Sequence, residues 1–89
     1  MKAYRFEEKN VVAGDTLENS RVWDGDQPTD DELPGVCAFE TKEQAEKYAQ
    51  YSHNLGQIVE IEGEKVGTGL DLVGEVIIRD AVVTAIYAW

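Results

Sequence analysis

The chain has few basic residues, one cysteine and no long apolar run, and each of these absences excludes a class of protein. Its 8 lysines and arginines are outnumbered by 18 acidic residues, so the formal net charge is −10. A surface of this charge repels phosphate groups, which argues against direct binding to nucleic acids or to anionic membranes. We expect instead a protein partner, in particular one with a basic surface.

The single cysteine, Cys37, excludes an internal disulfide framework and is typical of a reducing compartment. No segment reaches the roughly 18 consecutive apolar residues that a membrane helix needs. The N-terminal sequence MKAYRFEEKN lacks the apolar region of a secretory signal. We therefore expect a cytoplasmic protein. A chain of 89 residues is predicted to form one small acidic domain, residues 1–89.

Acidic residues are concentrated in residues 24–35, DGDQPTDDELPG, which include no basic residue. The prolines, the glycines and the mutual repulsion of the carboxylates indicate a loop. The first two aspartates have the spacing of a calcium-binding loop, but Pro28, Thr29 and Gly35 occupy later positions of that motif, so we predict no metal site. We assign protein binding to the acidic residues of this loop, Asp24, Asp26, Asp30, Asp31 and Glu32.

The clearest secondary-structure signal is a helix start. Thr41 and Gln44 have the spacing of a capping box, in which the hydroxyl group accepts a backbone N–H and the glutamine side chain returns to the cap. Small and aromatic residues then recur at the helical positions i, i+3, i+4 and i+7, namely Ala45, Tyr48, Ala49 and Ser52. Asn54 and Gly56 are stop signals. One main helix is predicted over about residues 41–54.

Alternating and β-branched segments predict strands at residues 2–6, 57–63 and 75–89. Arg79 and Asp80 are expected to interrupt the last of these with a turn or a bulge. Residues 62–74 contain four glycines and predict a long turn. The fold class is therefore α+β, with one main helix packed on a small, mainly antiparallel sheet.

Cys37 and His53 are the only thiol and imidazole of the chain, so a Cys–His nucleophile pair has to be considered. Cys37 lies in the apolar run GVCAF, where a cysteine behaves as a small inert core residue. His53 lies in the last turn of the predicted helix, where the helix dipole stabilises a cation. We expect both residues to be structural.

Three short motifs succeed one another along the chain: AYRF at residues 3–6, CAFETKEQAEKYA at 37–49 and GEVIIRDAVVTAI at 74–86. In this order they resemble the Arg-Ser-Glu branch of the ADP-ribosyltransferase-like domains, in a shortened form. The resemblance implies three catalytic positions. Arg5 would order the site and contact the phosphates of NAD, and Thr41 would match the first serine of the middle motif. Glu75 would hydrogen-bond the nicotinamide ribose and stabilise an oxocarbenium-like transition state.

Three functional hypotheses follow. Lys42 and Glu43 stand where the family has Thr and Ser, and Val73 stands where protein-modifying members often have a further Glu. The first hypothesis is therefore a catalytically reduced ADP-ribosyltransferase-like module that binds a protein or a nucleotide and is not an enzyme. The second is a phage-type acidic inhibitor that mimics nucleic-acid charge and blocks a basic surface. The third is an active ADP-ribosyltransferase or NAD glycohydrolase. Only this third hypothesis requires a cofactor, NAD.

Overall fold

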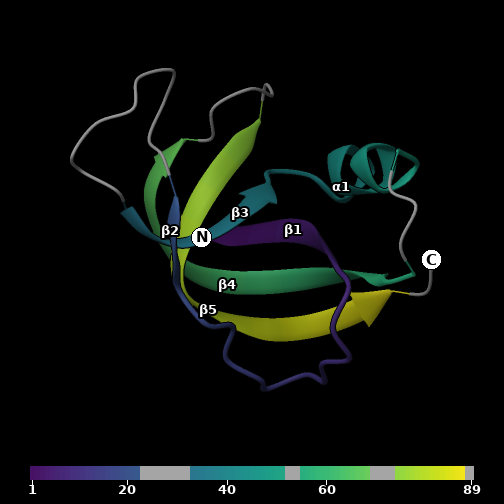
Figure 1. Ribbon diagram of the computed structural model, residues 1–89, viewed down its shortest axis with the longest axis horizontal. Coiled ribbons are helices and arrows are strands. Elements are labelled where there is room, and N and C mark those ends of the chain that lie inside the picture. Colours follow the sequence, from purple (N-terminus) through teal and green to yellow (C-terminus); the bar gives the residue numbers. More distant parts are fainter. Residues whose placement is uncertain (23–32, 52–54, 69–73, 88–89) are drawn as a thin grey trace.

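The computed structural model describes residues 1–22, 33–51, 55–68 and 74–87 (Figure 1). Its elements are, in order, β1 (Lys2–Glu7), β2 (Ser20–Val22), β3 (Leu33–Phe39), α1 (Lys42–Ala49), β4 (Gln57–Thr68) and β5 (Glu75–Tyr87). In Figure 1 the strands occupy the centre of the molecule and α1 lies at one end of the sheet. Outside the described residues lie His53 and the acidic loop residues assigned to protein binding, Asp24, Asp26, Asp30, Asp31 and Glu32.

The strand pairs of the described residues are antiparallel, in agreement with the predicted mainly antiparallel sheet. The sheet order is β1-β4-β5-β3-β2, with the short β2 paired to the beginning of β3. The sheet curls so far that β1 also meets β3, at the single pair Tyr4 and Phe39. Past this pair no further ladder joins the two strands within the described ranges, so an opening remains between them.

The sheet buries apolar side chains on both of its faces. One cluster draws on β1, β3, β4 and β5 without the helix and therefore lies inside the curl; it includes Ala3, Ala38, Ile61, Ile78 and Val83. The other cluster lies under α1 and consists of Phe6, Phe39, Ala45, Ala49 and Ile58. Because adjacent residues of a strand point to opposite faces, a strand such as β1 contributes to both clusters.

The start of α1 is as predicted, but the helix is shorter. The Thr41 hydroxyl accepts the Gln44 backbone N–H at 3.2 Å, and the Thr41 N–H donates to the Gln44 side chain at 3.2 Å, which confirms the capping box. The helix has eight residues and Gln50 is its C-cap, so the predicted main helix over 41–54 was too long.

The reason for the shorter helix lies in its packing face. Ala45 and Ala49 are fully buried, whereas the side chains of Tyr48 and Tyr51 are 49% and 77% exposed. Within α1 the buried residues are therefore Ala45 and Ala49 alone, and the sheet dominates the fold. No helix in the described ranges has both the length and the apolar composition needed to span a bilayer.

The two long strands depart from the sequence prediction. β4 continues to Thr68 through a region that the sequence predicts as a turn, because its glycines are part of the strand. A Cβ atom on Gly63 would lie 2.5 Å from the Arg79 carbonyl oxygen, so only glycine permits the close approach of β5. Register shifts between β4 and β5 mark bulges, which let long strands bend.

β5 likewise runs through Arg79 and Asp80 without a turn. Asp80 has a positive φ of 54°, which an aspartate tolerates better than most residues. The Asn19 side chain accepts the Asp80 backbone N–H at 2.9 Å and donates to its carboxylate at 2.8 Å. The pairing with β4 changes register here, from Glu62 opposite Val82 to Glu64 opposite Arg79, so the predicted bulge is confirmed and Asn19 stabilises it within a continuous strand.

Candidate functional site

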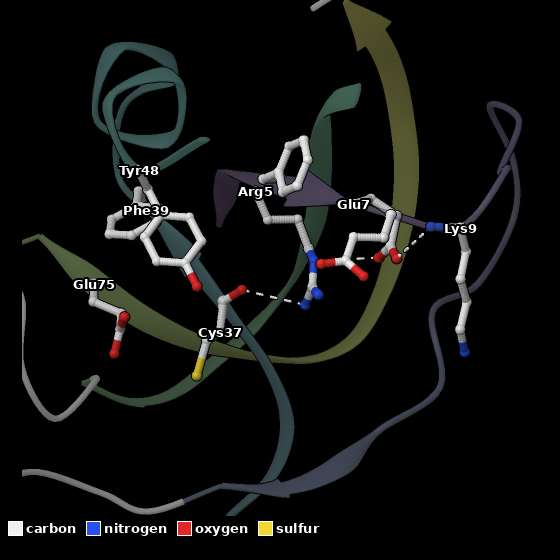
Figure 2. Close-up of a pocket in the computed structure, with 9 residues that line it drawn as sticks. Arg5, Glu7, Lys9, Cys37, Phe39, Tyr48 and Glu75 are labelled. Carbon is white, nitrogen blue, oxygen red and sulfur yellow. Dashed lines mark hydrogen bonds and ion pairs between the residues drawn. The ribbon is translucent and has the colours of Figure 1, made fainter. Parts of the chain in front are cut away.

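A pocket of about 310 Å³ lies at the opening between β1 and β3 (Figure 2). Two of the three predicted catalytic residues, Arg5 of β1 and Glu75 of β5, line it. Phe39 and Tyr48 form part of the wall, with ring centroids 5.6 Å apart. Figure 2 shows Arg5 and Glu75 on different sides of the pocket, with the Tyr48 hydroxyl group between them.

Arg5 spans the opening. Its Nη1 donates to the Cys37 carbonyl oxygen at 3.3 Å, and its Nε lies 3.3 Å from a carboxylate oxygen of Glu7 (Figure 2). The Nε–H is buried and is not directed at a hydrogen-bond acceptor in the described part of the chain. The contact with Glu7 is therefore an ion pair without hydrogen-bond geometry. Arg5 ties β1 to β3 beyond their single strand pair.

Glu7 is buried although it carries a charge, with only 8% of its surface exposed. Besides the ion pair with Arg5, its carboxylate accepts the backbone N–H of Lys9 at 3.2 Å. The Lys9 carbonyl oxygen in turn accepts the Gln57 side-chain amide at 3.1 Å. A buried carboxylate needs such partners to offset its lost hydration. The Arg5–Glu7 pair is thus part of the framework of the pocket.

Cys37 does not lie in the core, contrary to the prediction. Its neighbours Val36 and Ala38 point inward, 7% and 0% exposed, so the strand alternation places Cys37 on the outer face, where it is exposed and lines the pocket. Loss of water around the thiol raises the pKa of Cys37, the negative charge of Glu75 raises it further, and Arg5 opposes both effects. A thiol with a raised pKa forms little thiolate, so this pocket does not activate Cys37 as a nucleophile.

Thr41, the third predicted catalytic residue, does not line the pocket. It contacts the site only indirectly, through its capping partner Gln44. Gly74, at φ 84°, directly precedes Glu75, and a Cβ atom there would overlap the Gln44 side chain. The backbone carbonyl of Gly74 also accepts the Glu40 N–H at 3.0 Å. These contacts hold the start of β5 beside the start of α1 and thereby position Glu75.

Among the described residues, the charged lining of the pocket is slightly acidic. Three carboxylates, Glu7, Glu8 and Glu75, accompany the two cations Arg5 and Lys9, a difference of −1. In a protein whose formal net charge is −10, this lining attracts a cation and opposes a phosphate group. No group of three or more histidine, cysteine or acidic side chains suited to a metal ion occurs among the residues that the structure describes.

Sequence reasoning missed the roles of Glu7, Lys9 and Tyr48. Glu7 follows an alternating strand and looks like a surface charge, because nothing local shows that the curled sheet encloses it. Tyr48 was assigned to the packing face of the helix from its spacing. Its ring does contact Phe39, but half of its surface stays exposed beside the pocket.

No model of a known protein family matches the chain, and no curated protein or solved structure matches it either. The resemblance to ADP-ribosyltransferase-like domains therefore rests on the three sequence motifs alone.

Proposed function

We propose that the chain is a non-catalytic binding module whose pocket receives a basic side chain of a protein partner. The observation that carries this proposal is the charge of the lining, in which three carboxylates accompany two cations among the residues that the structure describes. The half-exposed ring of Tyr48 adds a face that attracts a cation. An acidic inhibitor that blocks a basic surface is one form that such a module could take.

A lysine or arginine side chain fits this lining in two ways. Its apolar stem can pack against the aromatic wall of Phe39 and Tyr48, while its charged end reaches the carboxylate of Glu75. A hydrogen bond between an ammonium or guanidinium group and a carboxylate is stronger than a neutral one. Since the attraction is electrostatic and partly exposed to solvent, salt should weaken it.

The proposal can be tested by titrating isotope-labelled protein with tetralysine and following the amide signals by NMR. Glu75→Gln should weaken binding by about two- to fivefold, the effect of one partly exposed ion pair. Glu62→Gln is the matched control, because Glu62 is an exposed carboxylate of β4 outside the pocket. Affinity should also fall between about 20 mM and about 200 mM salt. Equal losses in the two variants would show that only net charge matters and would refute the proposal.

The convergence of Arg5 and Glu75 on one pocket favours a second candidate, a nucleotide-binding module of the ADP-ribosyltransferase-like type. In this case Arg5 would leave Glu7 and contact the phosphates of NAD. Titration with NAD separates the two candidates: saturable binding that is lost in Glu75→Gln would support the second. Release of nicotinamide, abolished by the same substitution, would support the active enzyme. Under our first proposal neither is observed, and no cofactor is needed.

A further inference from the structure

Arg5 is held in the wall of the pocket by imperfect contacts. Its Nε lies 3.3 Å from a carboxylate oxygen of Glu7 without hydrogen-bond geometry, so the buried Nε–H has no acceptor among the described residues. Its Nη1 donates to the Cys37 carbonyl oxygen at 3.3 Å, slightly beyond the usual range of about 2.7–3.2 Å. A buried donor without an acceptor has lost its hydrogen bonds to water, and it regains them when it moves into solvent.

Glu7, in contrast, requires a cation beside it. Its side chain is only 10% exposed, and a buried carboxylate that loses its counter-charge is strongly destabilised. The group that now compensates this charge is a guanidinium group, which also reaches the Cys37 carbonyl oxygen (Figure 2). The position therefore has the shape and the acceptors for a guanidinium group, whichever chain supplies it.

The Arg5 side chain has open space on two sides. A second cavity, of about 480 Å³, shares Arg5, Glu7 and Lys9 with the pocket and is otherwise lined by different residues. Arg5 is partly exposed and belongs to neither core cluster. Its side chain can therefore leave Glu7 for solvent without displacing core side chains.

We infer that Arg5 is an internal occupant of the cation site, and that an arginine of the partner displaces it and pairs with Glu7. The exchange replaces one cation by another, so the charge of Glu7 stays compensated. An arginine that is not tied to β1 can turn two N–H groups toward the carboxylate, a geometry that Arg5 does not reach. This inference rests on the proposed function, and it adds that the partner's side chain is arginine rather than lysine and that Arg5 competes with it.

The test uses three amino acids with acetyl and amide groups on their ends: arginine, lysine, and citrulline, which keeps the shape of arginine without its charge. Each is titrated by NMR into the wild-type protein and into Arg5→Met, in which the internal competitor is absent. Blocked arginine should bind Arg5→Met about tenfold more tightly than the wild type, the effect of one hydrogen bond to a charged group. Blocked lysine should gain less, and blocked citrulline should gain nothing.

Lys9→Met is the matched control for charge. It removes the same charge from the lining of the pocket, but Figure 2 shows the Lys9 ammonium group turned away from the Arg5–Glu7 pair. The backbone N–H that Lys9 donates to Glu7 is unchanged by the substitution. Lys9→Met should therefore tighten the binding of blocked arginine by no more than about twofold.

The Nε–H signal of Arg5 gives a measurement on the wild-type protein, which does not depend on the folding of a variant. Saturation with blocked arginine should move this signal to the position of a solvated arginine and speed its exchange with water. Blocked citrulline should leave the signal in place.

The outcomes distinguish this inference from the proposed function. Equal gains in Arg5→Met and Lys9→Met would show that only charge matters, and weaker binding to Arg5→Met would make Arg5 part of the receptor; either result refutes the inference. If Arg5→Met does not fold, an unmoved Arg5 signal in the saturated wild type refutes it. Blocked lysine that binds as tightly as blocked arginine overturns the preference for arginine. The proposed function fails separately, when tetralysine does not distinguish Glu75→Gln from Glu62→Gln.

Discussion

Two arginine–glutamate pairs in this protein differ in a way that distance alone does not reveal. On the surface of β4 and β5, Arg79 lies 2.7 Å from Glu64, and the two side chains are 39% and 62% exposed. In the opening between β1 and β3, Arg5 lies 3.3 Å from Glu7, and these side chains are 24% and 10% exposed. We expect the longer contact to matter more for stability, because a hydrated pair loses little when separated, whereas Glu7 is only 8% exposed and regains little hydration when Arg5 is removed.

The largest expected effect comes from breaking the buried pair. Arg5→Met keeps much of the side-chain volume but leaves the Glu7 carboxylate without its cation. We expect a loss of about 2–3 kcal/mol in the free energy of unfolding, below the range for a fully buried pair because Arg5 is partly exposed. Arg79→Met should leave stability unchanged. Urea unfolding of both variants measures the difference, and equal stabilities would show that burial does not distinguish the two pairs.

The next effect concerns Thr41, which follows the pocket residue Phe39 closely in sequence but caps the helix α1 in the structure. Thr41→Ala should cost about 1 kcal/mol, the usual loss for a helix cap, while Thr41→Ser should restore most of it. Tetralysine should bind Thr41→Ala as it binds the wild type, because Thr41 does not line the pocket. Weaker binding in a variant that remains folded would place Thr41 in the site after all.

A third carboxylate, Glu60 of β4, extends the comparison to pH, because its side chain is only 14% exposed and is held by neutral as well as charged partners. A hydrogen bond of 2.8 Å from the Thr84 hydroxyl lowers the pKa of Glu60 most, and contacts with Tyr4 and Lys2 lower it further, against the opposing effect of burial. A carboxyl group whose pKa is lower in the folded state stabilises the fold above its ordinary pKa of 4.5, and this stabilisation is lost as the pH falls through the folded value.

Thr84→Val removes the largest cause of this shift. We expect the variant to be about 1 kcal/mol less stable near neutral pH and to lose less stability than the wild type between about pH 6 and about pH 3. Unfolding measured by urea at several pH values tests this. Parallel pH profiles for the two proteins would show that the Thr84 bond does not control Glu60.

The smallest effect concerns the thiol of Cys37, which lines the pocket. Because the pKa of Cys37 is raised, iodoacetamide should alkylate it more slowly near neutral pH than it alkylates a blocked cysteine, although the residue is exposed. Glu75→Gln should speed the reaction, since it removes a negative charge that contributes to the shift. A rate equal to that of the free amino acid derivative would contradict the raised pKa of Cys37, and an unchanged rate in Glu75→Gln would contradict the contribution of Glu75 to it.

Much of the fold could be predicted where the signal is local. The antiparallel strands and the helix start at Thr41 and Gln44 follow from alternation and from capping chemistry, each within a few residues. The end of the helix and the length of β4 could not be predicted. Both depend on tertiary contacts: Ala45 and Ala49 are the residues that α1 buries before its C-cap at Gln50, and Gly63 permits a strand where β5 approaches closely.

The candidate site shows the same division. The resemblance to a family singles out Arg5 and Glu75, and the fold brings both to one pocket. The burial of Glu7 and the exposure of Cys37 were not foreseeable, because strand alternation predicts two faces but not which face the curled sheet encloses. The local sequence thus determined the acidic character of the chain, its strands and its helix cap. The tertiary structure decided the pocket. It lies where β1 and β3, which meet at the single pair Tyr4 and Phe39, leave an opening, and charged side chains from distant segments surround it.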